Sequence, residues 1–382
     1  MDVLIVVTQS LVARYLFLDA KPRCSKPALR AILAGLSVVW AIVLCGIIQN
    51  IVRSHPSWGI DTPAILGAWV SAFEILWGFA SCLLLPIYMA SREALRRLPA
   101  DFSPARRRLL QATTAVAMAT PIAALAFGGL VERTDFHVRE VDLPVPGLHP
   151  DLEGFAIVQI TDLHVSAYLS VRQAARVVDM ANEIKPRLTL VTGDLISSRG
   201  DPLDATIGEL ARLRADQGVI GCLGNHEVYA ECEDYATEQA RLRGIEFLRM
   251  AARPVRFGNG VVNFAGVDYQ AYRDRPRYLT GADKLVVTGV PNILLSHNPD
   301  VFPVAVRQGY GAVIGGHTHG GQVAVEILRQ NLNLVRFVTP YVKGLYRSGA
   351  ASCYVSAGIG TIGMPVRLGA PPELTLLRLR RA

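Results

Sequence analysis

Long apolar segments are confined to the first third of the chain. Residues Ala31–Val52 contain no charged side chain, and a helix of this length spans roughly 30 Å of hydrocarbon. Leu109–Val131 also lacks charge, and Pro63–Ala90 is interrupted only by Glu74. Because none of the three segments has a polar face, we predict membrane-spanning helices rather than buried helices of a soluble protein.

Two features of this region have two interpretations each. Val3–Leu18 is short and carries Arg14, so it is either a fourth span or a helix that lies in the membrane interface. Glu74 is either a functional intramembrane carboxylate or a helix-packing residue. Residues 1–131 are therefore predicted to form a transmembrane region of three or four helices.

Basic residues lie on one side of the predicted spans. Four precede the first strong span and six separate the second from the third, whereas the loop 53–62 has one. The positive-inside rule then places residues 20–30 and 92–108 in the cytoplasm. The run Arg106–Gln111 resembles either a twin-arginine export signal or a stop-transfer cluster, and both give the same orientation. We expect a multi-pass protein of the cell (inner) membrane, with everything after about residue 132 extracytoplasmic.

The composition agrees with membrane segments. Of the 382 residues, 51% are hydrophobic and 19% are charged, against about 25% charged in an ordinary soluble domain. Lys and Arg exceed Asp and Glu by 39 to 32, but the predicted cytoplasmic loops account for this excess. The expected partner is therefore the lipid bilayer, and nucleic acid is not expected. Cys222 and Cys232 either pair across the loop between them or are unrelated thiols.

Short apolar runs bounded by turn residues characterise the second half. Phe155–Thr161 and Arg187–Thr192 are predicted strands, and Ser170–Ile184 between them is a predicted helix. Further predicted elements are helices at Thr206–Arg214 and Glu233–Arg243, and strands at Gly218–Leu223, Gly260–Val267, Asn292–Ser296, Ala312–Gly315, Gln322–Val325, Cys353–Ser356 and Leu374–Leu379. The alternation favours an α/β domain over residues 153–382, with residues 132–152, rich in Pro and acidic turns, as a linker.

Polar side chains follow five of these strands. The segments are Asp162-Leu163-His164, Gly193-Asp194, Gly224-Asn225-His226-Glu227, Ser296-His297-Asn298-Pro299 and Gly315-Gly316-His317-Thr318-His319-Gly320. Five of the eight histidines lie in them, which isolated core or loop histidines do not explain. In open α/β sheets the loops after the strands converge on one crevice, so these side chains are expected to meet.

The side-chain types indicate divalent metals. Carboxylate oxygen, imidazole nitrogen and amide oxygen suit Mn²⁺, Fe²⁺ or Zn²⁺, and the set holds no thiolate of a structural zinc site. There are more candidate ligands than one ion needs. Two ions about 3.5–4 Å apart can activate water and clamp both oxygens of an in-line displacement at phosphorus. We therefore predict two divalent metal ions and a hydrolase of phosphoric esters that works by metal-hydroxide attack.

The five segments in this order resemble the calcineurin-like metallophosphoesterase superfamily. The tail, Gly358–Thr361, Pro365–Arg367 and Pro371–Glu373, is similar to its membrane-associated bacterial branch. The resemblance covers about residues 150–382 and implies a fold of two packed β-sheets flanked by helices.

The resemblance also implies roles for single residues. Asp162, His164 and His319 would bind the first metal, and Asn225, His297 and His317 the second. Asp194 would bridge the two metals. His226 would hold the scissile phosphate or protonate the leaving group. The resemblance further implies that small residues let the backbone approach the metals, at Gly193, Gly224, Gly315 and Gly316.

The chain departs from the Ser/Thr phosphatases of that superfamily. Their GDxxDRG and GNHExR segments correspond to residues 193–200 and 224–229, which lack the second Asp and the phosphate-binding Arg. Arg199 could partly replace that arginine. A phosphoprotein substrate is thus disfavoured, and a phosphodiester or phosphoanhydride, lipid-linked or in the envelope, is favoured. The alternatives are a phosphodiesterase for soluble nucleotides and a non-catalytic membrane sensor.

Overall fold

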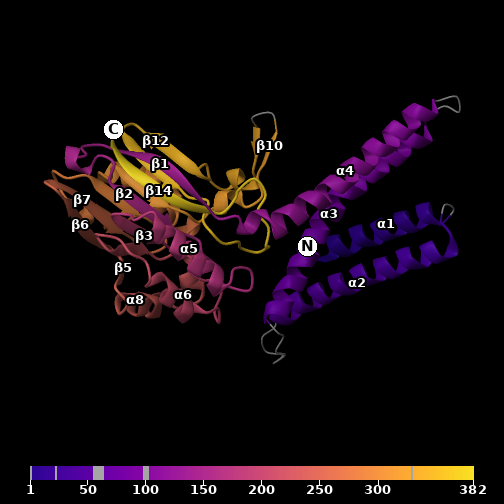
Figure 1. Cartoon of the computed structure of the whole chain (residues 1–382), viewed down its shortest axis with the longest axis horizontal. Helices are drawn as coiled ribbons and strands as arrows, with labels where there is room; N and C mark the ends of the chain where they lie inside the picture. Colours follow the sequence, from indigo (N-terminus) through magenta and orange to yellow (C-terminus); the bar gives the residue numbers. More distant parts are fainter. Residues whose placement is uncertain (1, 22–23, 55–63, 98–102, 328–329) are drawn as a thin grey trace. The chain divides into compact units, whose positions relative to one another are not determined.

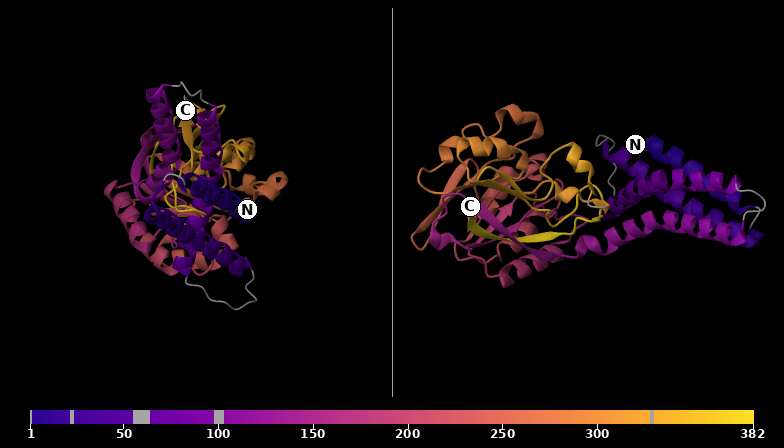
Figure 2. Two further views of the ribbon diagram at one scale, coloured as in Figure 1. Left: turned by 90° about the vertical axis from the view of Figure 1, so that its right-hand side faces the viewer. Right: turned by 90° about the horizontal axis from the view of Figure 1, so that it is seen from above.

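The chain divides into two compact units, Met1–Gly129 and Leu130–Ala382 (Figures 1 and 2). The structure, a computed structural model, describes residues 2–21, 24–54, 64–97, 103–327 and 330–382. Each unit is described by itself.

The first unit consists of helices in the part that the structure describes. They are α1 (Asp2–Ala20), α2 (Lys26–Ser54), α3 (Ala64–Arg96) and α4 (Pro104–Leu130). Within α2, Lys26–Gln49 is long and apolar enough to cross a membrane, and it is the one such helix among the described residues. The predicted span Pro63–Ala90 falls on α3, apart from Pro63, which lies outside the described residues. The predicted span Leu109–Val131 falls on α4, which ends at Leu130, and the weaker candidate Val3–Leu18 falls on α1. Their crossing of the membrane stays a prediction.

Polar and small residues join three of these helices. Glu74 of α3 is buried against Gly46 of α2, where a Cβ on the glycine would lie 2.7 Å from the Glu74 Cβ. Trp77 of α3 donates a hydrogen bond to the side chain of Gln9 on α1. Glycine thus permits close helix packing and buried polar groups connect the helices, as in membrane bundles. Glu74 therefore lies at a helix–helix contact.

The second unit contains two six-stranded sheets. The strands of the first, in spatial order, are β1 (His137–Val145), β14 (Glu373–Arg381), β2 (Ala156–Ile160), β3 (Leu188–Thr192), β4 (Val219–Cys222) and β5 (Ile245–Phe247). Those of the second are β12 (Gly344–Ser348), β13 (Ala351–Val355), β9 (Ala312–Gly315), β8 (Asn292–Leu295), β7 (Gly260–Gly266) and β6 (Ala251–Phe257). Strands β2 to β5 are parallel, as are β7, β8, β9 and β13. A separate hairpin pairs β10 (Val325–Ile327) with β11 (Gln330–Leu332).

Apolar side chains fill the space between the sheets and beneath the helices. The inter-sheet cluster includes Ile157, Leu190, Ile220, Phe264, Ile293 and Ile314, all fully buried. The outer face of the first sheet is covered by α5 (Val171–Glu183), α6 (Leu203–Leu210) and α8 (Glu233–Arg241) (Figure 1). That of the second sheet packs against α9 (Phe302–Gln308). Because both faces are covered, the central strands are continuous apolar runs. The predicted fold of two sheets flanked by helices is confirmed.

The stretch predicted as a linker contains an edge strand. Residues 137–145 form β1, which pairs in parallel with β14 over nine residues. Its charged side chains bind across to β14, where Arg380 lies 2.7 Å from Asp142 and Arg378 pairs with Glu140. An edge strand with charges on its exposed face resembles a polar linker in sequence, because charges on edges prevent aggregation. The prediction of a simple linker over residues 132–152 therefore needs this correction.

Candidate metal centre

Every predicted site residue follows the C-terminal end of a strand in one of the two sheets. Asp162 and His164 follow β2, Asp194 follows β3, and Asn225 and His226 begin α7 (Asn225–Tyr229) after β4. In the second sheet, His297 follows β8, and His317 and His319 follow β9. Gln159 of β2 joins these strand ends, since its amide donates 2.9 Å hydrogen bonds to the Thr192 hydroxyl and the Gly315 carbonyl. The two sheets thus present their loops at one edge.

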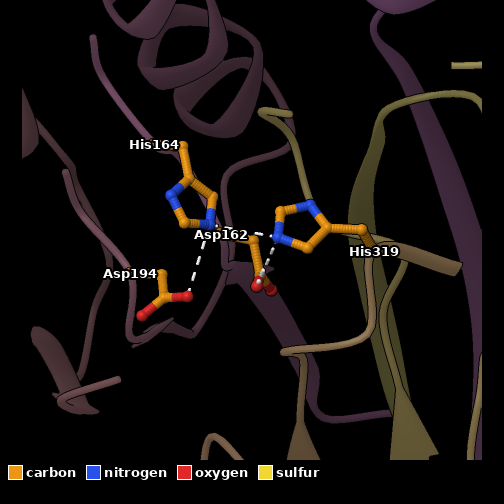
Figure 3. A group of neighbouring side chains, drawn as sticks. All are labelled: Asp162, His164, Asp194 and His319. Carbon is orange, nitrogen blue, oxygen red and sulfur yellow. Dashed lines mark hydrogen bonds and ion pairs between the residues drawn. The ribbon is translucent and has the colours of Figure 1, made fainter. Parts of the chain in front are cut away.

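Four side chains form the first ligand group. The candidate ligand atoms of Asp162, His164, Asp194 and His319 all lie within 4.8 Å of one another (Figure 3). His164 Nε2 is 3.0 Å from His319 Nε2 and 3.3 Å from an Asp194 oxygen. His319 Nε2 is 3.4 Å from Asp162 Oδ1.

A second group shares Asp194 with the first. Asp194, His297 and His317 also lie within 4.8 Å of one another by their ligand atoms. His297 Nε2 is 3.1 Å from Asp194 Oδ2, and the rings of His297 and His317 are 5.1 Å apart. Asp194 therefore occupies the position expected of a bridging carboxylate. The assignment of the individual ligands stays a prediction.

Two buried polar atoms at this place suit a cation. His297 Nδ1 lies 2.7 Å from the Thr192 carbonyl, so this nitrogen carries the donated proton. His297 Nε2 then points toward the Asp162 and Asp194 carboxylates without a hydrogen bond to either, and Asn225 Oδ1 also has no hydrogen-bond partner among the described residues. Buried polar atoms without partners are rare in proteins, and ligating histidines usually have the other ring nitrogen hydrogen-bonded. Both atoms fit metal ligands.

The charges of the cluster favour a cation as well. Burial raises the pKa of Asp162. Burial also acts to raise the pKa of Asp194, but the charge of the facing His297 and a hydrogen bond from His164 hold it well below its usual range. Burial acts to lower the pKa of His297, and the two carboxylates outweigh it and raise that pKa to about 10. The carboxylates thus stabilise positive charge between them.

His317 and His319 are held in the form that binds metals. Burial lowers the pKa of His317 to about 3 and lowers that of His319 well below its usual value. At neutral pH both rings are uncharged and keep a lone pair for a cation. Together with the oxygen ligands, they make a donor set that fits divalent metal ions.

The backbone is strained at five of the predicted ligands. Positive φ angles occur at Asp162 (52°), His164 (49°), Asp194 (55°), His317 (74°) and His319 (52°). Such conformations cost about 1–3 kcal/mol each for residues with a side chain, and they cluster at functional sites. The neighbouring glycines leave room for the carboxylates, since a Cβ on Gly224 would lie 2.2 Å from Asp194 Oδ1 and one on Gly316 2.1 Å from Asp162 Oδ2.

His226 lies beside the first group. Its backbone N–H donates to Asp194 Oδ1 at 2.9 Å, and its ring is 4.6 Å from that of His164. His226 Nδ1 lies 2.5 Å from the Ser197 carbonyl, which leaves Nε2 for a substrate oxygen. Its predicted role, holding the scissile phosphate or protonating the leaving group, suits this position and stays a prediction.

Sequence reasoning missed the role of Glu227. Its buried carboxylate accepts hydrogen bonds from the backbone N–H groups of Asp194 (3.0 Å), Leu195 (2.7 Å) and Gly224 (2.7 Å). It therefore fixes the loop of the bridging carboxylate against the start of α7. The sequence did contain a signal for it. Glu227 lies three positions after Gly224, the residue that precedes α7, which is the spacing of an N-terminal capping box.

Arg367 lies in the C-terminal tail, and the sequence assigned it no role. Its fully buried guanidinium donates to the carbonyls of Ala357, Gly360 and Ala370 at 2.5–3.0 Å. One of its nitrogens lies 3.5 Å from His319 Nδ1. Arg367 thus joins the C-terminal loops to one predicted ligand, which only the tertiary structure reveals.

The sequence left open whether Cys222 pairs with Cys232 and whether Arg199 replaces the missing arginine. Cys222 is buried and Cys232 half-buried, and both are free thiols, so the alternative of a braced loop is not formed. Arg199 is 80% exposed and pairs with Glu231 at 3.4 Å, so its charge is directed toward that carboxylate. The position of the missing phosphatase arginine is taken by Tyr229, whose ring lies 5.5 Å from that of His226.

Comparison with known proteins identifies relatives of this domain. Residues 155–321 match the family model of calcineurin-like phosphoesterases. A Danio rerio protein named transmembrane protein with metallophosphoesterase domain is 28% identical over 370 residues, covering 92% of this chain and 80% of its own. An uncharacterized metallophosphoesterase of Campylobacter jejuni, Cj0846, is 29% identical over 247 residues, covering 64% of this chain and 63% of its own.

One solved structure, TT1561 of Thermus thermophilus, is 12% identical with a TM-score of 0.35, and the match covers 53% of this chain and 89% of that one. The sequence relatives include vertebrate as well as bacterial proteins. They support the superfamily and do not single out a bacterial branch.

Removal of the Asp194 carboxylate tests whether the predicted residues bind the metals. We expect Asp194→Ala to lose bound metal and to lower turnover of an aryl phosphodiester by about 10²-fold or more, because both ligand groups lose a member. Metal analysis of the purified full chain and steady-state kinetics measure this. Asp216→Ala, at an exposed ion pair with Arg187, is the control and should retain both. Retention of metal and turnover by Asp194→Ala would show that this prediction is wrong.

Glu227 is expected to act on the metal centre through the backbone. Glu227→Gln replaces an acceptor of three N–H groups by an amide that is itself a donor, and should cost about 1–3 kcal/mol of stability. Metal affinity should fall about 10–100-fold, as for other residues that orient ligands. Thermal unfolding and metal titration are the measurements, with the exposed Glu231→Gln as control. A lower melting temperature with unchanged metal affinity would reduce Glu227 to a purely structural role.

Proposed function

We propose that this chain is a membrane-anchored phosphodiesterase or pyrophosphohydrolase with two metals, because residues 155–321 match the calcineurin-like phosphoesterases and carry a candidate metal centre. Its substrate is a lipid-linked or envelope phosphate ester. The observation that carries the proposal is the pair of ligand groups that share Asp194.

The residues divide the work of hydrolysis between them. The first metal would be held by Asp162, His164 and His319, the second by Asn225, His297 and His317, with Asp194 between the two. When bound, the two ions supply Lewis-acid activation of water and neutralise charge on the phosphate. His226 holds a phosphate oxygen or gives the leaving oxygen its proton from Nε2, since Nδ1 is engaged by the Ser197 carbonyl. Glu227 keeps the Asp194 loop in place through its three hydrogen bonds.

The replacement of the phosphate-binding arginine by Tyr229 supports a singly charged phosphate group. A phosphomonoester dianion is usually held by a bidentate arginine. Tyr229 stands where related phosphatases have that arginine, and Arg199 pairs with Glu231 instead. A phosphodiester carries one charge at the scissile phosphorus and needs no such clamp.

The apolar helix within α2 supports a substrate at the membrane. Lys26–Gln49 is long and apolar enough to span a bilayer, and the Danio rerio relative carries the word transmembrane in its name. Anchoring raises the effective concentration of the domain toward substrates held in the same bilayer. The positive-inside pattern supports a multi-pass arrangement in the inner membrane with the domain outside the cytoplasm.

A substrate screen separates the alternatives. With Mn²⁺ added, we expect hydrolysis of lipid-linked phosphodiesters or pyrophosphates to exceed that of nucleotide diesters, and phosphopeptides to be turned over least. A chelator should abolish turnover, and added Mn²⁺ or Zn²⁺ should restore it, because the predicted ligands are oxygen and nitrogen atoms. Preference for a phosphopeptide would contradict the proposal, whereas preference for a nucleotide would favour a soluble substrate.

The orientation has a direct test. Protease added to intact spheroplasts should digest the domain after residue 132, since the basic loops are predicted to be cytoplasmic. Immunoblotting with a tag after Ala382 follows the loss of the domain, and a cytoplasmic protein serves as the lysis control. Digestion only after permeabilisation would place the domain in the cytoplasm.

A further inference from the structure

We propose that an apolar–basic surface beside the metal centre docks on anionic lipid headgroups and presents lipid-linked phosphates to the metals. The surface comprises Arg273, Arg277, Arg336, Phe337 and Val338. The inference deepens the proposed function and rests on it where it concerns the substrate.

The apolar part of the surface is held out into solvent. Phe337 ends the turn η8 (Leu334–Phe337) and is 89% exposed, the highest value among the large apolar side chains of the described residues. Val338 follows and is 57% exposed. Leaving such side chains in water forgoes about 25 cal/mol for each Å² of apolar area that could be buried, so neighbouring exposed apolar residues often mark a binding site.

The basic part comes from a second turn next to the first. The turn η4 (Tyr272–Arg277) carries exposed arginines at 273, 275 and 277, and Arg336 lies exposed on η8. Arg275 connects the two turns, since its guanidinium lies 2.5 Å from Asp300 and 3.4 Å from the Val338 carbonyl. Thr339 also donates to Asp300. The two turns are thus in direct contact, and we group their exposed apolar and basic side chains as one surface.

This surface is attached to the loop that carries two predicted ligands. Asn333 donates a 2.8 Å hydrogen bond to the Gly320 carbonyl, and Thr318 donates to the Val342 carbonyl. The segment 333–342 is therefore bonded at both ends to the loop of His317 and His319. On the other side, the ring of Tyr272 lies 5.5 Å from the ring of His317. Whatever binds the surface is held next to the metal centre.

The chemistry of the surface fits a bilayer rather than a protein. Arg273 lies 3.9 Å from the Asp274 carboxylate, whereas Arg277 and Arg336 form no ion pair within the described part of the chain. Arginines near an anionic membrane are attracted to its headgroups, and an aromatic side chain next to a basic one suits the headgroup level. A stable protein interface needs a larger apolar centre than two side chains. The candidate span in α2 would keep the same chain at the membrane.

The test uses the full chain in lipid nanodiscs. Backbone amides of 334–339 should exchange hydrogen more slowly in nanodiscs with phosphatidylglycerol than in nanodiscs of phosphatidylcholine alone or in detergent. Phe337→Asp should raise KM for a lipid phosphodiester by about five-fold or more and leave a soluble aryl phosphodiester unchanged, because a buried charge opposes insertion. The paired change Arg273→Gln and Arg277→Gln should remove the effect of phosphatidylglycerol. Leu242→Asp, at an apolar residue that is 61% exposed beyond α8, is the matched control and should change neither.

Each outcome separates the docking surface from the proposed substrate. Equal exchange at 334–339 in all three environments would overturn docking and indicate that the surface is not covered by lipid. Equal loss of lipid and soluble turnover in Phe337→Asp would overturn it as well, because the segment would then act on the site itself. The wild-type protein could hydrolyse only soluble diesters while phosphatidylglycerol still slows hydrogen exchange at 334–339. That result would support docking on lipid and contradict the proposal of a lipid-linked substrate.

Discussion

Two carboxylates buried in one cluster are the constraint on which the C-terminal domain depends. Asp162 and Asp194 are 0% and 1% exposed, and both lie near His297 Nε2, at 3.8 and 3.1 Å. In a buried environment two negative charges so close repel unless positive charge lies between them. The pKa of His297, raised to about 10, is the response of the protein to that need. The proposed pair of divalent ions would meet that need, and His317 and His319 are already uncharged and able to bind them.

The scaffold holds this cluster together against strain. Five predicted ligands have positive φ angles, which strand ends tolerate only when the surrounding structure fixes them. Glu227 supplies three hydrogen bonds on one side, and Arg367 ties the C-terminal loops to His319 on the other. The parallel strands behind these loops are buried on both faces, so they form a rigid base for the site. Part of the folding stability of the domain thus offsets the backbone strain at the predicted ligands.

The proposed substrate rests on the surroundings of the metal centre rather than on its ligands. The ligand set permits many phosphate esters. Tyr229 in place of an arginine and the pairing of Arg199 with Glu231 support the proposed singly charged phosphate, and the apolar–basic surface supports the proposed lipid-linked substrate. The apolar helix within α2 is consistent with the same location.

The resemblance of the sequence to a known superfamily implied the two packed sheets, and the local pattern by itself determined the α/β class, the expected reaction class and the gathering of the site residues. Each predicted ligand directly follows an apolar strand, and strand ends of such sheets converge, so local patterns were sufficient. Only the tertiary structure decided that residues 137–145 form a strand with β14, that Glu227 supports Asp194, and that Arg367 lies behind His319. These contacts join segments up to more than two hundred residues apart, and they depend on how side chains pack when the sheets close. No local pattern of hydrophobic and polar residues contains that information.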